Sequence, residues 1–254
     1  MLLVLLVLPL ALTACKSAPT PYKPKIMPRA YLVGANLRQA KLHKVNLYAA
    51  DLRQADLFRA DLRQAFLGRA ILRDADLQEA RMTRIDLSEA DLQSAALVRA
   101  TLGQAVLEGA DLRRADLYLA DLRQADLRDA VLHDARLRRA RLGKADLRGA
   151  SLAGADLRGA DLRGTRLEGA DLRRARLEGA KLSQARLDGA SLCESDRPSV
   201  KQSRGTPTWV DCAAPPPDEA PGTPAGGPVA AAQPAKAPPS TAPPAKAPAP
   251  TTKR

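Results

Sequence analysis

The 254-residue chain has few aromatic residues and few histidines. Phe, Trp and Tyr make up 3% of the sequence, and the only histidines are His43 and His133. A core with so few large rings must be aliphatic. Both histidines stand at outward positions of the repeat described below, and on a four-sided coil they would lie on opposite faces, several coils apart. They could not join one metal site or share a catalytic triad, and glycine-rich phosphate loops are absent. We therefore expect no enzyme activity, no metal or other cofactor, and no small-molecule substrate.

Long apolar runs are absent beyond the first fifteen residues, MLLVLLVLPLALTAC. This run is too short to span a bilayer as a mature helix, and its small residues at the end are typical of a secretory signal. Leu12-Thr13-Ala14-Cys15 also resembles a bacterial lipobox. In that motif a peptidase cuts before the cysteine, whose thiol carries diacylglycerol. The resemblance implies that Cys15 is the lipidated first residue of the mature chain.

The signal also indicates a location. Lys16, rather than Asp, follows the cysteine, which by resemblance to Gram-negative sorting signals favours the outer membrane. We therefore expect a cell-envelope protein that is anchored to the membrane through the lipid on Cys15. Signals of this class normally begin with Lys or Arg, whereas Met1-Leu2-Leu3 carries no charge. Translation from Met27 would give a cytoplasmic protein, and this alternative stays open.

A strict five-residue repeat occupies most of the chain. Leucine stands at every fifth position from Leu32 to Leu192 and is replaced once, by Met82. Alanine stands two residues before each of these positions, with three exceptions, Val45, Ile85 and Thr165. Internal repeats of this strictness decide the architecture before any single residue does.

A period of five excludes the common folds. In an α-helix each leucine would lie roughly 140° from the previous one, so no buried stripe would form. In a continuous strand, an odd period places successive leucines on opposite faces. Alanine and leucine two residues apart do share a face of a short extended segment. The period therefore predicts a solenoid in which each short segment ends at a corner, with leucine and alanine inside.

The repeats resemble those of the pentapeptide-repeat proteins, whose consensus is A-(D/N)-L-x-x. Ala55-Asp56-Leu57-Phe58-Arg59 and Ala125-Asp126-Leu127-Arg128-Asp129 follow it. The resemblance covers about residues 30–195. It implies an all-β fold, a right-handed quadrilateral β-helix with four pentapeptides per coil, about eight coils and disordered tails. With strands about 4.8 Å apart, the rod would be roughly 40 Å long.

Composition divides the chain into five segments. Residues 1–14 form the expected signal peptide, and residues 15–29 form a proline-rich tether that begins with the lipidated cysteine. Residues 30–195 form the β-helix, and residues 196–212 form a C-terminal cap segment. Residues 213–254 are rich in Pro, Ala and Lys, and such a segment cannot bury enough surface to offset ordering. We expect it to be a disordered tail.

The charge of the chain suggests a binding surface. The formal net charge is +12, and residues 30–195 hold 29 Lys and Arg against 24 Asp and Glu. Nine repeats read Asp-Leu-Arg, and the simplest interpretation of these charges is a solvated face. A basic stretch nevertheless forms a candidate polyanion-binding patch. Its residues are Arg136, Arg138, Arg139, Arg141, Lys144 and Arg158.

Of two further cysteines, Cys193 stands at the last repeat and Cys212 follows Thr-Trp-Val-Asp. In an oxidising compartment they can form a disulfide that closes a loop of about 20 residues and stabilises by roughly 3 kcal/mol. Such a bridge would fold the segment that holds Trp209 over the open end of the solenoid, where core and strand edge are exposed. In the cytoplasm both would be free thiols.

Two function classes are compatible with these observations. The first is a non-enzymatic, lipid-anchored scaffold or interaction rod of the cell envelope, whose partner would be an envelope polymer or a protein. The second follows from the family resemblance, since some quinolone-resistance members mimic DNA and shield gyrase with an acidic rod. This rod is basic and its N-terminus resembles an export signal, so we favour the first. A cytoplasmic protein that acts on gyrase or binds nucleic acid is the alternative.

Overall fold

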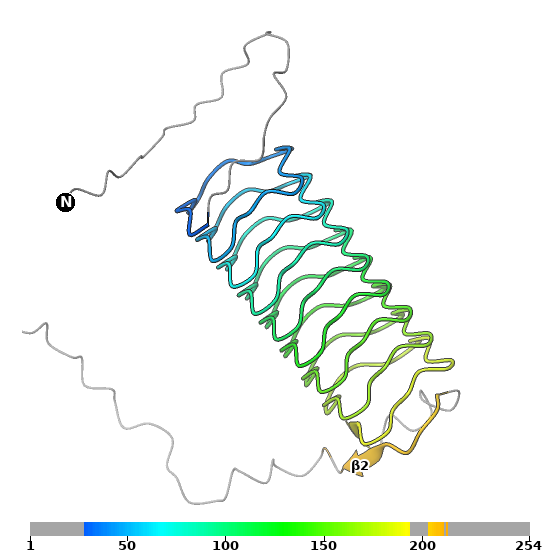
Figure 1. Cartoon of the computed structure of the whole chain (residues 1–254). Helices are drawn as coiled ribbons and strands as arrows, with labels where there is room; N and C mark the ends of the chain where they lie inside the picture. The colour runs from blue at the N-terminus through cyan, green and yellow to red at the C-terminus, as the bar shows by residue number, and fades with distance from the viewer. Residues whose placement is uncertain (1–27, 194–202, 211, 213–254) are drawn as a thin grey trace, which may run out of the picture. The chain divides into compact units, whose positions relative to one another are not determined.

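The computed structural model describes residues 28–193, residues 203–210 and Cys212, and these residues form a solenoid of stacked coils (Figure 1). The expected signal peptide, most of the tether with Cys15, and the C-terminal tail lie outside the described residues. No helix in the described part of the chain is long and apolar enough to cross a membrane.

A parallel ladder between equivalent positions of successive coils holds the solenoid together. Each bridge joins residues 20 positions apart, from Tyr31 with Asp51 to Asp171 with Ser191. Leu52 N–H donates to the Ile71 carbonyl of the next coil at 2.7 Å. One bridge falls in every five-residue repeat, so four repeats make one coil and give it four sides.

The corner between two sides is a tight turn. The Leu52 carbonyl accepts a hydrogen bond from Ala55 N–H at 3.1 Å, and Gln54, the second central residue of the turn, has a φ of 57°. The first central residue, Arg53, is not in the positive-φ region. A positive φ at the second central residue alone is typical of a type II turn. This turn redirects the chain after each leucine, which is why the period can be five.

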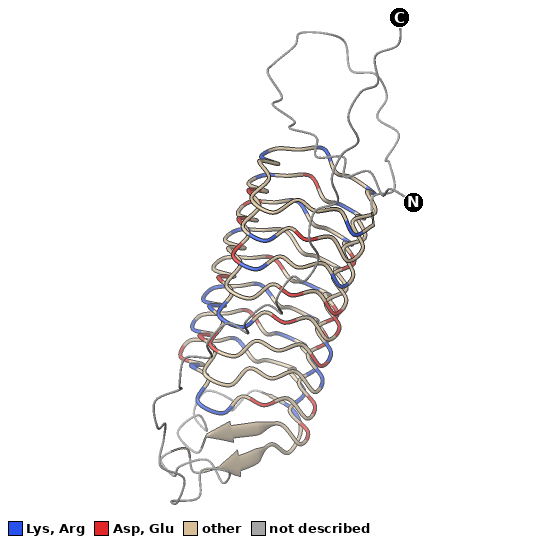
Figure 2. Ribbon diagram, turned by 90° about the vertical axis from the view of Figure 1, so that its left-hand side faces the viewer, with Lys and Arg blue, Asp and Glu red and all other residues tan. Residues whose placement is uncertain are grey.

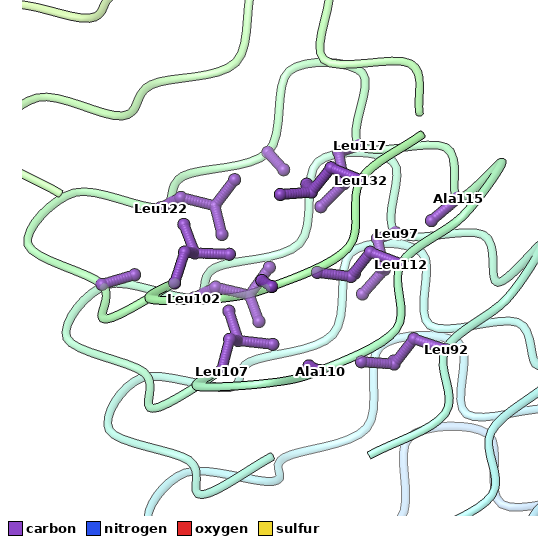
Figure 3. Packing of buried hydrophobic residues seen from close by; sticks show 14 of the residues in the cluster. Leu92, Leu97, Leu102, Leu107, Ala110, Leu112, Ala115, Leu117, Leu122 and Leu132 are labelled. Carbon is purple, nitrogen blue, oxygen red and sulfur yellow. The ribbon is translucent and has the colours of Figure 1, made fainter. Parts of the chain in front are cut away.

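The interior of the described solenoid is aliphatic. Leucines from all four sides of one coil point inward and meet the leucines of the coils above and below (Figure 3). Met82 and Ile85, which replace a leucine and an alanine, are 0% exposed, and the ladder continues through Arg81 with Thr101. Thr165 is the single buried polar residue among the described ones, and its hydroxyl donates to the Leu162 carbonyl at 2.7 Å.

The two strands lie at the C-terminal end of the solenoid. β1 (Ser191–Cys193) pairs in parallel with β2 (Thr208–Val210), and Leu192 lies opposite Trp209. Trp209 packs against the core cluster. The described part of the expected cap segment therefore adds one more rung to the ladder, with Trp209 at the register position that leucine holds in the repeats.

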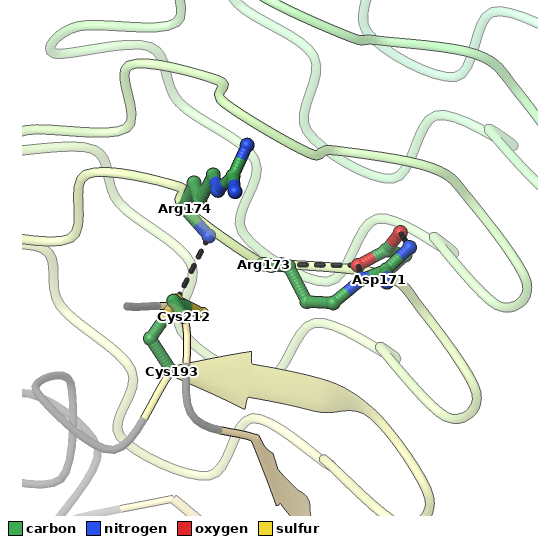
Figure 4. Close-up of a disulfide and its surroundings, with 5 residues drawn as sticks. All are labelled: Asp171, Arg173, Arg174, Cys193 and Cys212. Carbon is green, nitrogen blue, oxygen red and sulfur yellow. Dashed lines mark hydrogen bonds and ion pairs between the residues drawn. A yellow bond between two sulfur atoms is a disulfide. The ribbon is translucent and has the colours of Figure 1, made fainter. Parts of the chain in front are cut away.

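A disulfide joins Cys193 of β1 to Cys212, with the two Cα atoms 5.4 Å apart (Figure 4). The backbone N–H of Arg174 donates to the Cys193 Sγ at 3.0 Å. The bridge thus ties the additional rung to the last full coil.

A basic face as the candidate binding site

Where the residue before the leucine is Asp or Asn, its side chain completes the hydrogen bonding of the backbone. In the repeat Ala50–Gln54, four of the five N–H groups donate to carbonyl oxygens of the ladder or the turn. The fifth, that of Arg53, donates to the Asp51 Oδ1 at 3.3 Å. Asn36 and Asn46 accept the same bond from the residue two positions on. Asx side chains are suited to this local bond, which explains why the repeat prefers Asp or Asn at this position.

Arginine adds a second contact in the nine Asp-Leu-Arg repeats. In each one the guanidinium Nε and Nη2 donate to the two carboxylate oxygens, as in Arg123 with Asp121, at 2.8 Å and 2.6 Å. Such two-pronged pairs are stronger and more specific in geometry than single contacts. We call these pairs the arginine forks. They join Asp51 to Arg53, Asp61 to Arg63, Asp111 to Arg113, Asp121 to Arg123, Asp126 to Arg128, Asp146 to Arg148, Asp156 to Arg158, Asp161 to Arg163, and Asp171 to Arg173.

The forks keep their carboxylates charged. All nine aspartates have a pKa below the ordinary value. For Asp51, the side-chain hydrogen bond from Arg53 lowers the pKa most, against the opposing effect of burial. Each fork is therefore a closed ion pair at neutral pH. Its two charges largely cancel locally, and the external field of the rod comes from the remaining charged residues.

The four sides of the solenoid carry unequal charge, because side chains at equivalent positions of successive coils lie on the same side. We call one side the basic face; it consists of residues 40–44, 60–64, 80–84, 100–104, 120–124, 140–144, 160–164 and 180–184. It holds ten Lys and Arg against three Asp, a formal charge of +7. The other three sides of residues 30–195 hold the remaining 19 Lys and Arg against 21 Asp and Glu. Basic and acidic segments follow one another along the coils in Figure 2.

A shallow groove of about 1260 Å³ runs along the basic face from His43 to Gln184. Small residues, which lack side chains that would fill it, keep this groove open. A Cβ atom built on Gly103 would lie 3.7 Å from the Arg123 carbonyl oxygen, and one on Gly143 would lie equally far from that of Arg163. Both distances are ordinary contacts, so glycine is not required there by the backbone. The absence of these two side chains leaves space between the basic residues.

The structure divides the patch that the sequence suggested. Arg141 and Lys144 line the groove. The other four residues belong to the adjacent side or its corner: Arg136, Arg138, Arg139 and Arg158. Arg158 is in a fork with Asp156, and the Arg136 Nη1 lies 3.7 Å from the Asp116 Oδ2.

The groove also contains cations that the sequence reasoning missed, namely Arg63, Arg81, Arg84, Arg123 and Arg163. They are dispersed in the sequence and meet only because the coiling of the chain stacks equivalent positions on one side. A sum of the charges at sequence positions 20 residues apart would have identified these cations, because such positions lie on the same side of the solenoid.

The two histidines lie on different sides. His43 lines the groove, whereas His133 contacts the Ser151 hydroxyl on another side. Across the described ranges, no group of three or more His, Cys, Asp or Glu side chains could hold a metal ion.

These observations define the class of the protein: a four-sided parallel β-solenoid with an aliphatic interior and a charged outer surface. The pentapeptide-repeat family model matches the chain in eight copies, over residues 29–57, 50–93, 95–134, 130–169 and 170–196. The chain belongs to the pentapeptide-repeat family, whose members form right-handed quadrilateral β-helices.

Solved structures of the same family resemble it to different degrees. HetL, a pentapeptide repeat protein involved in heterocyst differentiation regulation in the cyanobacterium Nostoc, is 40% identical, with 66% of this chain and 86% of HetL covered and a TM-score of 0.31. QnrB1, a plasmid-mediated fluoroquinolone resistance protein, is 18% identical, with 72% and 94% covered and a TM-score of 0.47.

A third structure comes from a plant. A pentapeptide repeat protein of the Arabidopsis thaliana thylakoid lumen is 26% identical, with 48% of this chain and 74% of that protein covered and a TM-score of 0.24. The comparison with curated proteins gave no significant match.

Proposed function

We propose that the protein is a non-enzymatic, lipid-anchored rod of the cell envelope that binds an envelope polymer or a protein partner along its outer surface. The observation that carries this proposal is that aliphatic side chains fill the interior, whereas titratable side chains lie at the surface. The described core consists of aliphatic groups and the Thr165 hydroxyl, which is already bonded to the Leu162 carbonyl. Every titratable side chain among the described residues lies at the surface, so any activity must be displayed there.

The C-terminal disulfide supports an envelope location. Disulfides such as Cys193–Cys212 persist in oxidising compartments and are rare in the cytosol. The bridge agrees with the export signal that residues 1–15 resemble. A solenoid of about eight coils, roughly 40 Å long, would project its sides away from a lipid at Cys15.

Metabolic labelling with palmitate and cell fractionation test the anchor. We expect label on the wild-type chain in the membrane fraction and none on the Cys15→Ser variant. Cys193→Ser serves as the control, because it removes a cysteine without touching the lipobox, and it should keep the label. A cytoplasmic, unlabelled wild-type chain would contradict the proposal and favour the alternative, a cytoplasmic protein that acts on gyrase or binds nucleic acid.

A further inference from the structure

We propose that the basic face is a binding groove for a linear anionic polysaccharide, which lies along the solenoid axis and is held by three pairs of cations. The pairs are Lys41 with Lys44, Arg81 with Arg84, and Arg141 with Lys144. The last two pairs line the groove, whereas the first lies on the basic face in the coil of His43, where the groove begins. This inference rests on the proposed function, because it names the ligand of the interaction rod and the side that binds it.

The first argument is the availability of these cations. The three aspartates of the basic face, Asp61, Asp121 and Asp161, are each held in a fork by an arginine of the same coil. Five of the six paired cations make no ion pair with a described carboxylate: Lys41, Lys44, Arg81, Arg84 and Lys144. The sixth is Arg141, whose Nη1 lies 3.6 Å from the Asp121 Oδ2. The forks thus neutralise the acids of the face and leave these cations exposed to a ligand.

The second argument is the arrangement of the pairs. The two members of each pair come from one coil, and the pairs belong to the first, third and sixth coils of the face. With coils about 4.8 Å apart, the pairs are separated by about 10 Å and about 14 Å along the axis. A row of positive charge about 24 Å long matches an extended chain with regularly spaced anionic groups, and a groove lined by one sign of charge concentrates the field.

The third argument is the neutral lining of the groove. Between the cations lie hydroxyl and amide groups, among them Thr83, Thr101 and Ser183. Gln104 accepts a hydrogen bond from Arg84 Nε at 2.7 Å, and Gln124 accepts one from Gln104 Nε2 at 2.9 Å. Such groups both donate and accept hydrogen bonds, as sugar hydroxyls require.

The same lining distinguishes a polysaccharide from a nucleic acid. Proteins that bind single-stranded nucleic acids stack the bases on aromatic side chains. None of the described residues that line the groove is Phe, Tyr or Trp. The chemistry of the groove therefore favours a ligand with charges and hydroxyls and without bases.

Titration calorimetry on the purified full chain tests the proposal, with polygalacturonate as the anionic polysaccharide, dextran as the neutral one and poly(dT) as the nucleic acid. We expect polygalacturonate to bind, dextran not to bind, and poly(dT) to bind at least about tenfold more weakly. Affinity for oligogalacturonates should rise with length until the oligomer spans about 24 Å and then level off. Equal or tighter binding of poly(dT) would overturn the polysaccharide assignment.

Two quadruple variants with the same loss of charge locate the site. Serine at Arg81, Arg84, Arg141 and Lys144 should lower the affinity for polygalacturonate at least about 30-fold and reduce its salt dependence. Serine at four cations of the adjacent side, Arg99, Arg136, Arg138 and Arg139, should change the affinity less than about threefold. Equal losses of affinity in both variants would show that the net charge of the protein alone attracts polygalacturonate. That result would overturn the proposal that the groove is the binding site.

A variant that adds side chains to the groove, instead of removing them, distinguishes a loss of binding from a loss of the fold. Gly103→Glu with Gly143→Glu places carboxylates where a Cβ atom has room, so the fold should persist while binding is lost. Unchanged binding in a folded double variant would overturn the proposal. The binding assay does not require the lipid. If the chain does not bind polygalacturonate although Cys15 carries the lipid label, only the groove proposal is contradicted. If the chain binds polygalacturonate but carries no label, only the proposed lipid anchor is contradicted.

Discussion

Arg123 holds Asp121 in a fork across Leu122. The arginine Nε and Nη2 donate to the carboxylate at 2.8 Å and 2.6 Å, and its backbone N–H donates to Oδ1 at 3.2 Å. Leu122, between them, is 1% exposed. Three consecutive residues thus place an aliphatic group in the core and a closed ion pair outside. The same unit occurs nine times, so the inner and outer surfaces of the solenoid are built by one local pattern.

The inward direction of Leu122 predicts the effect of a charge there. Leu122→Asp would bury an unpaired carboxylate in a dry core, at a cost of several kcal/mol, and should prevent folding. Leu122→Met keeps the volume and should cost less than about 1.5 kcal/mol, since Met82 already occupies such a position. Circular dichroism and thermal melting measure both. Similar melting of the two variants would contradict the assignment of this side chain to the core.

The residue before the leucine should act as a hydrogen-bond acceptor rather than as a charge. Asp76 accepts the backbone N–H of Gln78 at 3.0 Å and is not in a fork. Asp76→Ala leaves this donor without its protein partner and should cost about 1 kcal/mol, whereas Asp76→Asn keeps the acceptor and should remain near wild type. Urea unfolding measures both. An equal loss in Asp76→Asn would mean that the negative charge, and not the acceptor, stabilises the turn.

The forks predict how stability depends on pH. Their aspartates have a pKa lowered from 3.8, as for Asp61, where the hydrogen bond from Arg63 is the main cause and burial opposes it. A carboxyl group with a lower pKa in the folded state stabilises the fold above its unfolded pKa, and this contribution disappears as the pH falls through the folded value. The urea midpoint should therefore stay level from neutral pH to about pH 5 and fall below about pH 4.

A triple variant isolates the contribution of the forks to that acid response. Arg53→Gln, Arg63→Gln and Arg163→Gln together remove three forks and should make the fall below pH 4 shallower. Glutamine at Arg99, Arg138 and Arg139, which are outside the forks, should leave the profile as in wild type. If both triple variants follow the wild-type curve, the forks do not determine the acid sensitivity.

The sequence predicts the solenoid well because each repeat is a local unit. The spacing of leucine and alanine indicates an aliphatic core and a corner in every repeat, and the structure confirms both for the described residues. The charge of a side is harder to predict, because it depends on residues of successive coils and on which carboxylates are already in forks. Arg158 looks available in the sequence but is held by Asp156, whereas Arg81 and Lys144 are distant in the sequence and share one groove.

The end of the solenoid departs from the period for a different reason. Arg186 pairs with Arg204 and Ser191 with Thr208, and both steps along the chain are shorter than the step between full coils. No repeat marks these residues, so periodicity could not assign them to a rung. The sequence offered only Trp209 and the two cysteines as signals that this segment packs on the last coil.

The last rung should depend on the disulfide, whereas the coils below it should not. Reduction of Cys193–Cys212 removes the covalent link between β1 and the residues after β2, and a bridge over a loop of this size contributes roughly 3 kcal/mol. Trp209 is the only tryptophan, so its fluorescence reports on this rung alone. Reduction, or the Cys193→Ser, Cys212→Ser double variant, should shift its emission to the red. Amide protons of Thr208 and Trp209 should exchange faster, while that of Leu52 stays protected by its bond to Ile71. A wild-type protein kept oxidised is the control. Loss of protection at Leu52 on reduction would instead show that the rung and the coils unfold as one cooperative unit.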